Sequence, residues 1–391
     1  MGSVQDARTK ELMQQAERAL QARDARSALG LLREAETRAP QDPGVKMQLA
    51  LALRATGDFP GALEAIDAAL AMDPYLLLAL LSRGWLLEKL NRPREAAIAY
   101  RNALKIVPPD DRLAQGLKAP VERAREVVKA DSDAAVAFVE ERLAEVRARH
   151  PDADLGRFER GRDIFLTGKK VYNSEPALLH YPMLPAEQFF DRRHFPWLGQ
   201  LEAATDMIRE ELLVVLQGDL EEMQPYIQYP PGVPVNQWVE LNYSPRWNSY
   251  FLWKDGVKDE AHCARCPHTA ALLESLPLLR QPGLGPTAMF SVLAPRTHIP
   301  PHSGSANTRC LVHLPLILPG PARFRVGNET RDWKMGEAWV FDDTIEHEAW
   351  NDADQTRVIL ILDVWNPYLS GPERELIAAM MSAKNEFTAR G

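Results

Sequence analysis

The residues best suited to chemistry gather in one stretch of the chain, residues 297–365, where they stand among apolar runs: His298, His302, His313, His347 and Arg357. His302 and His347 each follow a predicted strand, and Arg357 comes ten residues after the second histidine. A metal site needs imidazoles on separate rigid elements that aim into one cavity. A single histidine is usually structural, but this pair with its arginine indicates a candidate metal site. His298 is an outside candidate only.

The elements around these residues have the pattern of a β-domain. From about residue 236 onward, short runs of β-branched and aromatic residues alternate with Gly, Pro, Asn and Asp turns. Such closely spaced strands favour a sandwich or jelly-roll barrel, in which alternate residues of each strand point inward. A helical segment, Phe189–Leu216, is expected to flank it. The predicted strands are Ser249–Trp253, Ala288–Leu293, Thr308–Leu318, Ala322–Val326, Ala338–Phe341 and Arg357–Val364.

The first hundred residues repeat with a period of 34. Three sets of residues keep this spacing: Ala28, Ala62 and Ala96; Ala35, Ala69 and Ala103; Pro40, Pro74 and Pro108. Small alanines let two antiparallel helices approach closely, and a proline ends each unit because it cannot continue a helix. The pattern resembles the tetratricopeptide repeat, whose arrays usually present a concave surface to a peptide or protein.

These two patterns predict an α+β multidomain chain. A tetratricopeptide-like helical array occupies residues 1–110, and a helical extension or linker occupies residues 111–170. A jelly-roll domain, built as a double-stranded β-helix, occupies residues 171–391. The chemistry is expected in the jelly roll, since helical repeats of this kind hold partners and carry out no reaction themselves.

Roughly the last 200 residues resemble the aspartyl/asparaginyl β-hydroxylases, a branch of the 2-oxoglutarate oxygenases. The motifs that carry this resemblance follow one another in order along the chain: Pro301-His302-Ser303-Gly304, Val326-Gly327-Asn328-Glu329-Thr330, Phe341-Asp342-Asp343, Glu346-His347-Glu348-Ala349-Trp350 and Asp363-Val364-Trp365-Asn366-Pro367. A helical-repeat N-terminus also occurs in that family. The resemblance implies an Fe(II)- and O2-dependent dioxygenase that converts 2-oxoglutarate to succinate and CO2.

The resemblance also implies a role for individual residues. His302 and His347 match the two iron ligands, and Arg357 matches the arginine that pairs with the far carboxylate of 2-oxoglutarate. An arginine suits that carboxylate because its planar fork donates two parallel hydrogen bonds. Three further residues match positions around the cosubstrate or the pocket: Ser291, His313 and Trp247.

Two positions depart from common patterns. Many non-haem iron oxygenases add a carboxylate two residues after the first histidine, but Gly304 stands there. The resembled family also lacks that carboxylate, and water is expected in its place. Asp342 and Asp343 are expected to satisfy turn backbone groups. Leu311 stands where animal members carry a cosubstrate-contacting arginine, and Arg309, on the same strand face, is expected to take over part of that role.

Composition narrows the class of protein further. Hydrophobic residues make up 46% and charged residues 26%, and a net charge of −8 without a basic cluster argues against a nucleic-acid partner. The polar first 17 residues lack a signal-peptide core, and no apolar run reaches a membrane span, so a cytoplasmic protein without a membrane partner is expected.

Cys263 and Cys266 form one C-x-x-C flanked by His262 and His268, for which free thiols are favoured over zinc. Animal members of the resembled family have a disulfide, and Cys263 matches one of its cysteines. The position of the second cysteine falls at Ala270, so this disulfide is expected to be absent.

Three functions compete. The first is hydroxylation of the β-carbon of Asp or Asn in a peptide or protein held with help from the repeats. The second is hydroxylation of a small molecule, such as a free or carrier-bound amino acid or, least favoured, a lipid-linked acyl chain. The third is a non-enzyme scaffold with a degenerate barrel, against which the presence of both histidines, Arg357, Ser291 and His313 argues.

Overall fold

The structure is a computed structural model that describes residues 2–218, 222–281 and 283–390, with side chains from residue 7 onward. The chain divides into two compact units, Met1–Lys169 and Lys170–Gly391. Each unit is described by itself below.

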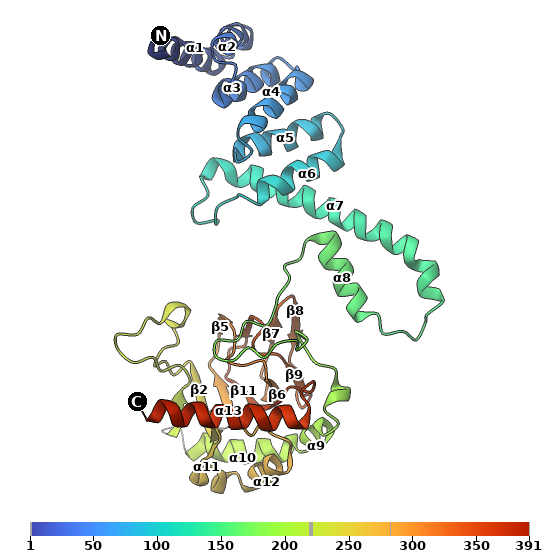
Figure 1. The fold of residues 1–391 in the computed structure, drawn as a ribbon, viewed down its shortest axis with the longest axis vertical. Coiled ribbons are helices and arrows are strands. Elements are labelled where there is room, and N and C mark those ends of the chain that lie inside the picture. Colours follow the sequence, from blue (N-terminus) through green and yellow to red (C-terminus); the bar gives the residue numbers. More distant parts are fainter. Residues whose placement is uncertain (1, 219–221, 282, 391) are drawn as a thin grey trace. The chain divides into compact units, whose positions relative to one another are not determined.

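The first unit is a stack of antiparallel helix pairs (Figure 1), as the 34-residue period predicts. The prolines of the period follow the second helix of each pair. Its helices are α1 (Gly2–Gln21), α2 (Ala25–Arg38), α3 (Pro43–Ala55), α4 (Phe59–Met72), α5 (Leu77–Lys89), α6 (Pro93–Leu104), α7 (Gln115–Ala148) and α8 (Gly156–Thr167).

Small residues at repeated positions allow the close packing of these helices. Ala28, Ala62 and Ala96 are fully buried. At Gly84 in α5, an added Cβ would lie 2.3 Å from the ring of Tyr100 in α6, so this contact requires glycine. The repeats therefore form one continuous apolar core that runs from α1 into the first half of α7.

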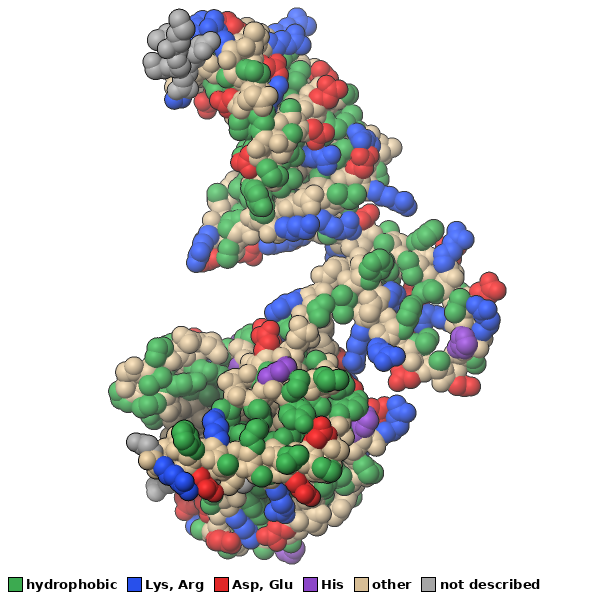
Figure 2. Space-filling model, viewed as in Figure 1, with side chains coloured by type: hydrophobic (Ala, Val, Ile, Leu, Met, Phe, Trp, Pro, Cys, Tyr) green, Lys and Arg blue, Asp and Glu red, His purple; other side chains and the backbone are tan. Residues whose placement is uncertain are grey.

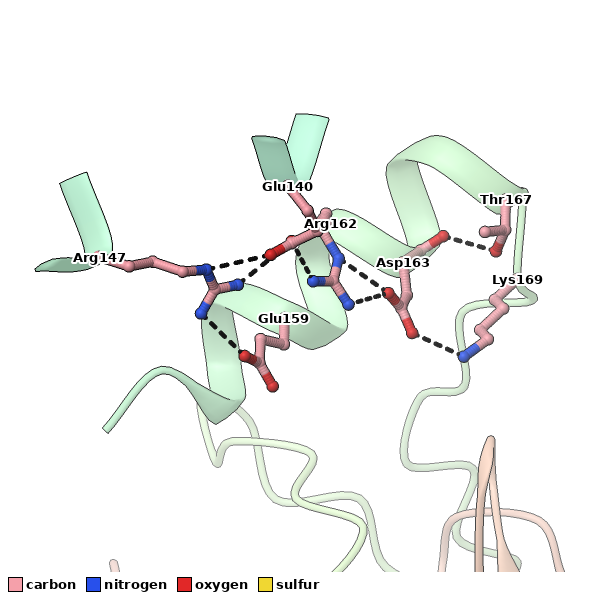
Figure 3. A network of polar contacts seen from close by, with 7 residues as sticks. All are labelled: Glu140, Arg147, Glu159, Arg162, Asp163, Thr167 and Lys169. Carbon is pink, nitrogen blue, oxygen red and sulfur yellow. Dashed lines mark hydrogen bonds and ion pairs between the residues drawn. The ribbon is translucent and has the colours of Figure 1, made fainter. Parts of the chain in front are cut away.

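The second half of α7 pairs with α8 through charge rather than through a core. None of the described residues of α8 is buried. Arg147 of α7 donates to Glu159 of α8 at 3.0 Å, and Arg162 of α8 donates to Glu140 of α7 (Figure 3). These ion pairs are only partly exposed, and ion pairs near the surface typically contribute about 1 kcal/mol or less each. On the face of the repeat unit seen in Figure 2, basic side chains are intermixed with acidic ones.

The second unit contains two antiparallel sheets. The larger sheet has the order β1-β2-β4-β11-β6-β9, with β3 paired to β2, and the smaller has the order β5-β10-β7-β8. This arrangement confirms the predicted antiparallel β-domain, and two separate sheets of this kind are compatible with the expected jelly roll. The strands are β1 (Gln224–Pro225), β2 (Trp247–Lys254), β3 (Val257–Lys258), β4 (Ala288–Leu293), β5 (Thr297–His302), β6 (Arg309–Ile317), β7 (Ala322–Val326), β8 (Glu329–Asp332), β9 (Trp339–Phe341), β10 (His347–Asn351) and β11 (Arg357–Trp365).

The larger sheet has a separate core on each face. One face packs against helices (Figure 1), and its core includes Leu212, Leu273 and Leu360. The other face shares a second core with the smaller sheet, through residues such as Phe324 and Ile359. The helices of this unit are α9 (Leu198–Ala203), α10 (Thr205–Gly218), α11 (Glu260–Arg265), α12 (Pro267–Ser275) and α13 (Gly371–Ala389), with short turns of helix at Arg192–His194 and Asn236–Trp238.

The strand predictions from sequence were correct for β2, β4, β6, β7, β9 and β11, within one or two residues at each end. The strands β1, β3, β5, β8 and β10 were not predicted. Pro300 and Pro301 prevented β5 from being predicted as a strand. This strand tolerates prolines because it lies at the edge of its sheet. The predicted helical segment Phe189–Leu216 is helical from Leu198 onward, in α9 and α10, whereas its first residue, Phe189, bridges to Phe341 instead.

Candidate active site

The two candidate ligands, His302 and His347, are direct cross-strand partners. His302 ends β5, His347 begins β10, and the antiparallel register places them opposite each other. Their ring centroids are 4.1 Å apart. The smaller sheet therefore brings together two side chains that lie 45 residues apart in the sequence.

A bulge in this strand pair determines which way the histidines point. The register of β5 with β10 shifts between His347 and Ala349, so that Ile299 pairs with Ala349 while His302 pairs with His347. Ile299 and His302 consequently share the cavity face. His298 lies on the outer face, where it bonds Glu348 at 2.8 Å and stacks on Trp350. A bulge re-aims side chains in this way because it breaks the period-two alternation of a strand.

Each histidine is fixed by a backbone carbonyl. The Nδ1 of His302 lies 2.8 Å from the oxygen of Pro300, and the Nδ1 of His347 lies 2.9 Å from that of Ile345. A carbonyl only accepts, so Nδ1 carries the proton and the lone pair of Nε2 is left for a metal. Burial lowers the pKa of His302 to about 3 and that of His347 to about 4. Both rings are therefore neutral and able to act as ligands near pH 7.

Arg357 is a buried cation without an anion. Its side chain is 1% exposed, and its Nε and Nη1 atoms have no hydrogen-bond partner among the described residues. Its guanidinium carbon lies 4.5 Å from the ring centroid of Trp333, which offers only a cation–π contact. Burial lowers the pKa of Arg357 to about 9. Such a group is costly unless a ligand supplies the missing carboxylate.

The other predicted cosubstrate residues lie around the same cavity. The indole Nε1 of Trp247 donates to the hydroxyl oxygen of Ser291 at 3.0 Å, which orients that hydroxyl. His313 is 5% exposed, its Nδ1 has no described partner, and burial beside Arg357 holds its pKa well below the usual range. Arg357 and His313 thus leave unpaired polar atoms at one end of the cavity.

The cavity has a volume of about 640 Å3, and all seven predicted residues line it: Trp247, Ser291, His302, Arg309, His313, His347 and Arg357. The register of the larger sheet arranges its lining in order. Arg357 begins β11, Ile359 and Ile361 follow on the same face, and Arg309 lies opposite Trp365 at the far end. The apolar side chains of Ile359 and Ile361, called the apolar belt below, therefore lie between the unpaired guanidinium of Arg357 and the far end of the cavity.

At that far end, Arg309 is already paired. It donates to Asp343 at 3.0 Å and to Asp363 at 3.4 Å. Burial alone would lower the pKa of Arg309, but the two carboxylates raise it above the usual value. The burial of Asp363 raises the pKa of its own carboxyl to about 7. Arg309 lines the cavity as expected, but two protein carboxylates already occupy its guanidinium.

Asp343 differs from its expected role as a turn residue. Asp342 does bond the turn, because it accepts from the amide of Thr344 at 2.9 Å. Asp343 instead fills the space beside Gly304, where an added Cβ would lie 1.9 Å from its Oδ2. Its Oδ1 has no described partner, and the group is 2% exposed. The Asp343 carboxylate thus lies beside Gly304, and no signal in the sequence distinguished Asp343 from Asp342.

Replacing Gly304 with alanine is expected to damage the site. The methyl group would overlap the Asp343 carboxylate, so either that carboxylate or the strand end that carries His302 must move. We expect affinity for Co(II), a spectroscopic probe of the histidine pair, to fall by about tenfold or more, as when an outer-shell partner is lost. Titration of the cobalt absorption bands measures it, with Gly371→Ala, whose added methyl meets no neighbouring atom, as the control. Equal cobalt affinity in both variants would contradict this account.

Acid is expected to destabilise the second unit through three histidines, the buried His313 and His347 and the half-buried His302. Their folded-state pKa values are lowered, whereas the unfolded chain takes up protons near pH 6.5. Stability is therefore complete above about pH 6.5 and is lost as the pH falls toward 4, by about 1.4 kcal/mol per pH unit for each histidine. Urea unfolding from pH 7 to 5 measures the slope. His313→Leu should reduce the slope by about a third, and His180→Gln, at an exposed position, should not.

The C-x-x-C pair is not arranged around a metal. Cys263 and Cys266 are buried free thiols, and burial raises their pKa to about 11 and 12. The flanking His262 bonds the carbonyl of Phe251, and His268 bonds Glu211. In the described part of the chain, no group of three or more His, Cys, Asp or Glu side chains is placed to hold a metal ion.

Comparison with known proteins identifies the family. The aspartyl/asparaginyl β-hydroxylase family matches residues 202–367, and the tetratricopeptide repeat matches residues 13–76 and 47–111. The chain is 36% identical over 213 residues to the ornithine lipid ester-linked acyl 2-hydroxylase of Rhizobium tropici, spanning 54% of this chain and 71% of that protein. The chain belongs to the aspartyl/asparaginyl β-hydroxylase family. This membership supports an oxygenase of the hydroxylase type. The separate repeat match shows that the chain also carries tetratricopeptide repeats.

Other relatives in this family match less of their own length. The mouse aspartyl/asparaginyl beta-hydroxylase is 39% identical over 135 residues, which are 34% of this chain and 18% of that protein. The aspartate beta-hydroxylase domain-containing protein 2 of Xenopus tropicalis is 26% identical over 249 residues, 61% of this chain and 64% of that protein. Among the described residues, no helix has the length and apolar character to cross a membrane.

Proposed function

We propose that the chain is an Fe(II)- and 2-oxoglutarate-dependent dioxygenase whose iron is held by His302 and His347. The observation that carries this proposal is the unpaired, buried guanidinium of Arg357 in the cavity that both imidazoles face. The donor set fits ferrous iron, since two neutral imidazoles leave positions open for substrates. With 2-oxoglutarate and O2, the iron supplies the oxidising power that places one oxygen atom on an unactivated carbon and leaves succinate and CO2.

The chain's own residues bind and orient the reactants. Arg357 would donate two parallel hydrogen bonds to the far carboxylate of 2-oxoglutarate, which neutralises its buried charge. Ser291, oriented by Trp247, and His313 would donate further hydrogen bonds at the same end. The apolar belt of Ile359 and Ile361 keeps water away from the reacting carbon.

Asp343 would act at the third ligand position. Gly304 has no side chain to offer, and the free Oδ1 of Asp343 faces the space beside it. A water bound there would donate a hydrogen bond to this carboxylate. Arg309 holds Asp343 in place and is itself paired with Asp363, so the aspartate is a positioning residue for the bound water in this proposal.

The proposed substrate is an Asp or Asn residue of a peptide or protein, hydroxylated at its β-carbon, with the repeats helping to hold it. The family match and the mouse relative support this class. A second candidate is the acyl chain of an aminolipid. It is favoured by the Rhizobium tropici relative, which matches over more of the chain, and by the apolar belt under the histidines.

A turnover assay distinguishes these functions. Purified protein with Fe(II) and 2-oxoglutarate should form succinate faster when a true substrate is added. A library of Asp- and Asn-containing peptides and a set of acylated ornithine lipids are each scanned for a one-oxygen mass gain. A product from peptides alone supports the first substrate class, and a product from lipids alone rejects it in favour of the second. Absence of any 2-oxoglutarate turnover with every class would leave the scaffold function.

A further inference from the structure

The segment that enters the second unit, residues 170–181, has an unusual course. It precedes the family match at residues 202–367 and has almost no regular secondary structure. Most of its side chains are exposed or half-buried, with Val171 at 57% and Leu178 at 49% exposure. This segment, called the strap below, places Tyr172 and Leu179 against apolar clusters, and most of its bonds to the two loops described next are made by its backbone amides.

The strap first bonds the loop that leads to His347. The amide of Glu175 donates to the carbonyl oxygen of Thr344 at 2.8 Å. The hydroxyl of Ser174 donates to Oδ2 of Asp342 at 2.7 Å. The other oxygen of Asp342 accepts from the amide of Thr344, so Ser174 completes the bonding of this turn. Thr344 stands only three residues before His347.

The strap then bonds the loop that follows His302. The amide of Ala177 donates to the carbonyl oxygen of Gly304 at 3.0 Å, and the amide of Leu178 donates to that of Ser305 at 2.8 Å. The amide of Tyr181 donates to Oδ1 of Asn307 at 2.7 Å. Gly304 stands two residues after His302, so the strap reaches both loops that adjoin the candidate ligands.

We propose that the strap positions the metal-binding histidines by tying these two loops together. Only one other described bond joins the loop backbones, from the amide of Gly304 to the oxygen of Asp343 at 2.6 Å. Without the strap, the loops that follow β5 and precede β10 would keep this backbone bond and the contact of Arg309 with Asp343. The two imidazoles would then keep their sheet register but lose their fixed separation, and a two-ligand site has no third side chain to compensate. This inference rests on the proposed function.

Linkage gives a direct test in the unmodified full chain. If the strap holds the ligand loops, a metal on the histidines must in turn stabilise the strap. Hydrogen exchange of peptides covering residues 173–179 is measured with and without saturating Co(II), whose absorption bands report binding independently. We expect exchange to slow by about tenfold in the wild type and to remain unchanged in His302→Ala. Cobalt binding without slower exchange in the strap would overturn the inference and leave the proposed metal site intact.

Variants of the strap provide the converse test. Ala177→Pro removes the amide that reaches Gly304, and Ser174→Ala removes the hydroxyl that reaches Asp342. We expect Co(II) to bind about tenfold more weakly in the first variant and a few-fold more weakly in the second, with affinity restored in Ser174→Thr. Tyr181→Phe is the matched control, because its hydroxyl lies 3.1 Å from Glu373 of α13 and away from both loops.

The outcomes separate this inference from the proposed function. Wild-type cobalt affinity in Ala177→Pro and Ser174→Ala would overturn the strap's role. An equal loss in Tyr181→Phe, or a loss that follows the thermal unfolding midpoint across all variants, would show general destabilisation and also overturn it. A wild-type chain that binds no Co(II) would reject the proposed metal site together with the inference.

Discussion

Replacing Arg357 with methionine is expected to abolish 2-oxoglutarate binding while making the ligand-free protein more stable. The guanidinium is 1% exposed and has no carboxylate partner in the described structure, so the folded chain bears the cost of a buried, unpaired charge. Apolar replacement of buried charges of similar volume often stabilises proteins, by about 1–4 kcal/mol. Loss of the charge pair with the cosubstrate costs about 2–5 kcal/mol, which is at least about 30-fold in affinity.

Two measurements on the same variant check this prediction. Calorimetric titration with 2-oxoglutarate in the presence of Co(II) reports affinity, and urea unfolding without ligand reports stability. Arg323→Met provides the control, because Arg323 is an arginine of β7 that is half-exposed over Trp350 on the outer face. Only the Arg357→Met variant is expected to bind 2-oxoglutarate more weakly and at the same time to be more stable toward urea. A destabilised Arg357→Met protein that still binds 2-oxoglutarate would contradict the assignment of this arginine.

Replacing either His302 or His347 with alanine is expected to eliminate metal binding and turnover. No other described histidine, cysteine or carboxylate joins the pair in a larger group that could hold the metal, so a single imidazole would remain. We expect Co(II) affinity to fall by at least about 100-fold, beyond the 10- to 100-fold cost of losing an outer-shell partner. Iron-dependent succinate formation should fall to the level of the enzyme-free reaction.

The control for this prediction lies in the same strand. His298 belongs to β5 like His302, but it bonds Glu348 on the outer face. His298→Ala should therefore retain cobalt binding within a few-fold of the wild type. If His298→Ala and His302→Ala lose cobalt affinity equally, the loss reflects disruption of β5 as a whole and not removal of a metal ligand. If His302→Ala keeps its turnover, the proposed ligand set is wrong.

The sequence predicted both units because their patterns are local. The 34-residue period fixes which alanines face a neighbouring helix, and Ala28, Ala62 and Ala96 are all fully buried. The longer strands β4, β6 and β11 were predicted because their apolar runs are bounded by turn residues. The strand signals depend on residues within about ten positions of one another, and the repeat depends on a fixed spacing along the chain.

The pairing of His302 with His347 could not be predicted in the same way. It depends on the register of β5 with β10 and on the bulge between them, neither of which has a local signal. The two prolines of β5 also argue against a strand when only the sequence is considered, because proline lacks the N–H that donates to a neighbouring strand. The sequence therefore indicated the two candidate histidines, but it did not indicate how the fold holds them together.

The charged residues behind the site were interpreted least well. Arg309 was expected to take over part of the contact with the cosubstrate, which stays a prediction, and the sequence did not indicate that it also pairs with Asp343 and Asp363. Asp343 was expected to serve a turn, as Asp342 does, although its side chain occupies the space that Gly304 leaves open. Adjacent aspartates of identical chemistry differ here because they project toward opposite sides of one loop, which only tertiary packing determines.

The most direct test of the account is a crystal structure determined without oxygen in the presence of Fe(II) and 2-oxoglutarate, with anomalous scattering used to place the iron. We predict one iron within about 2.1 Å of Nε2 of both His302 and His347, with water rather than a side chain beside Gly304. The far carboxylate of 2-oxoglutarate should lie on the guanidinium of Arg357. Iron bound elsewhere, or 2-oxoglutarate placed away from Arg357, would contradict the central claim.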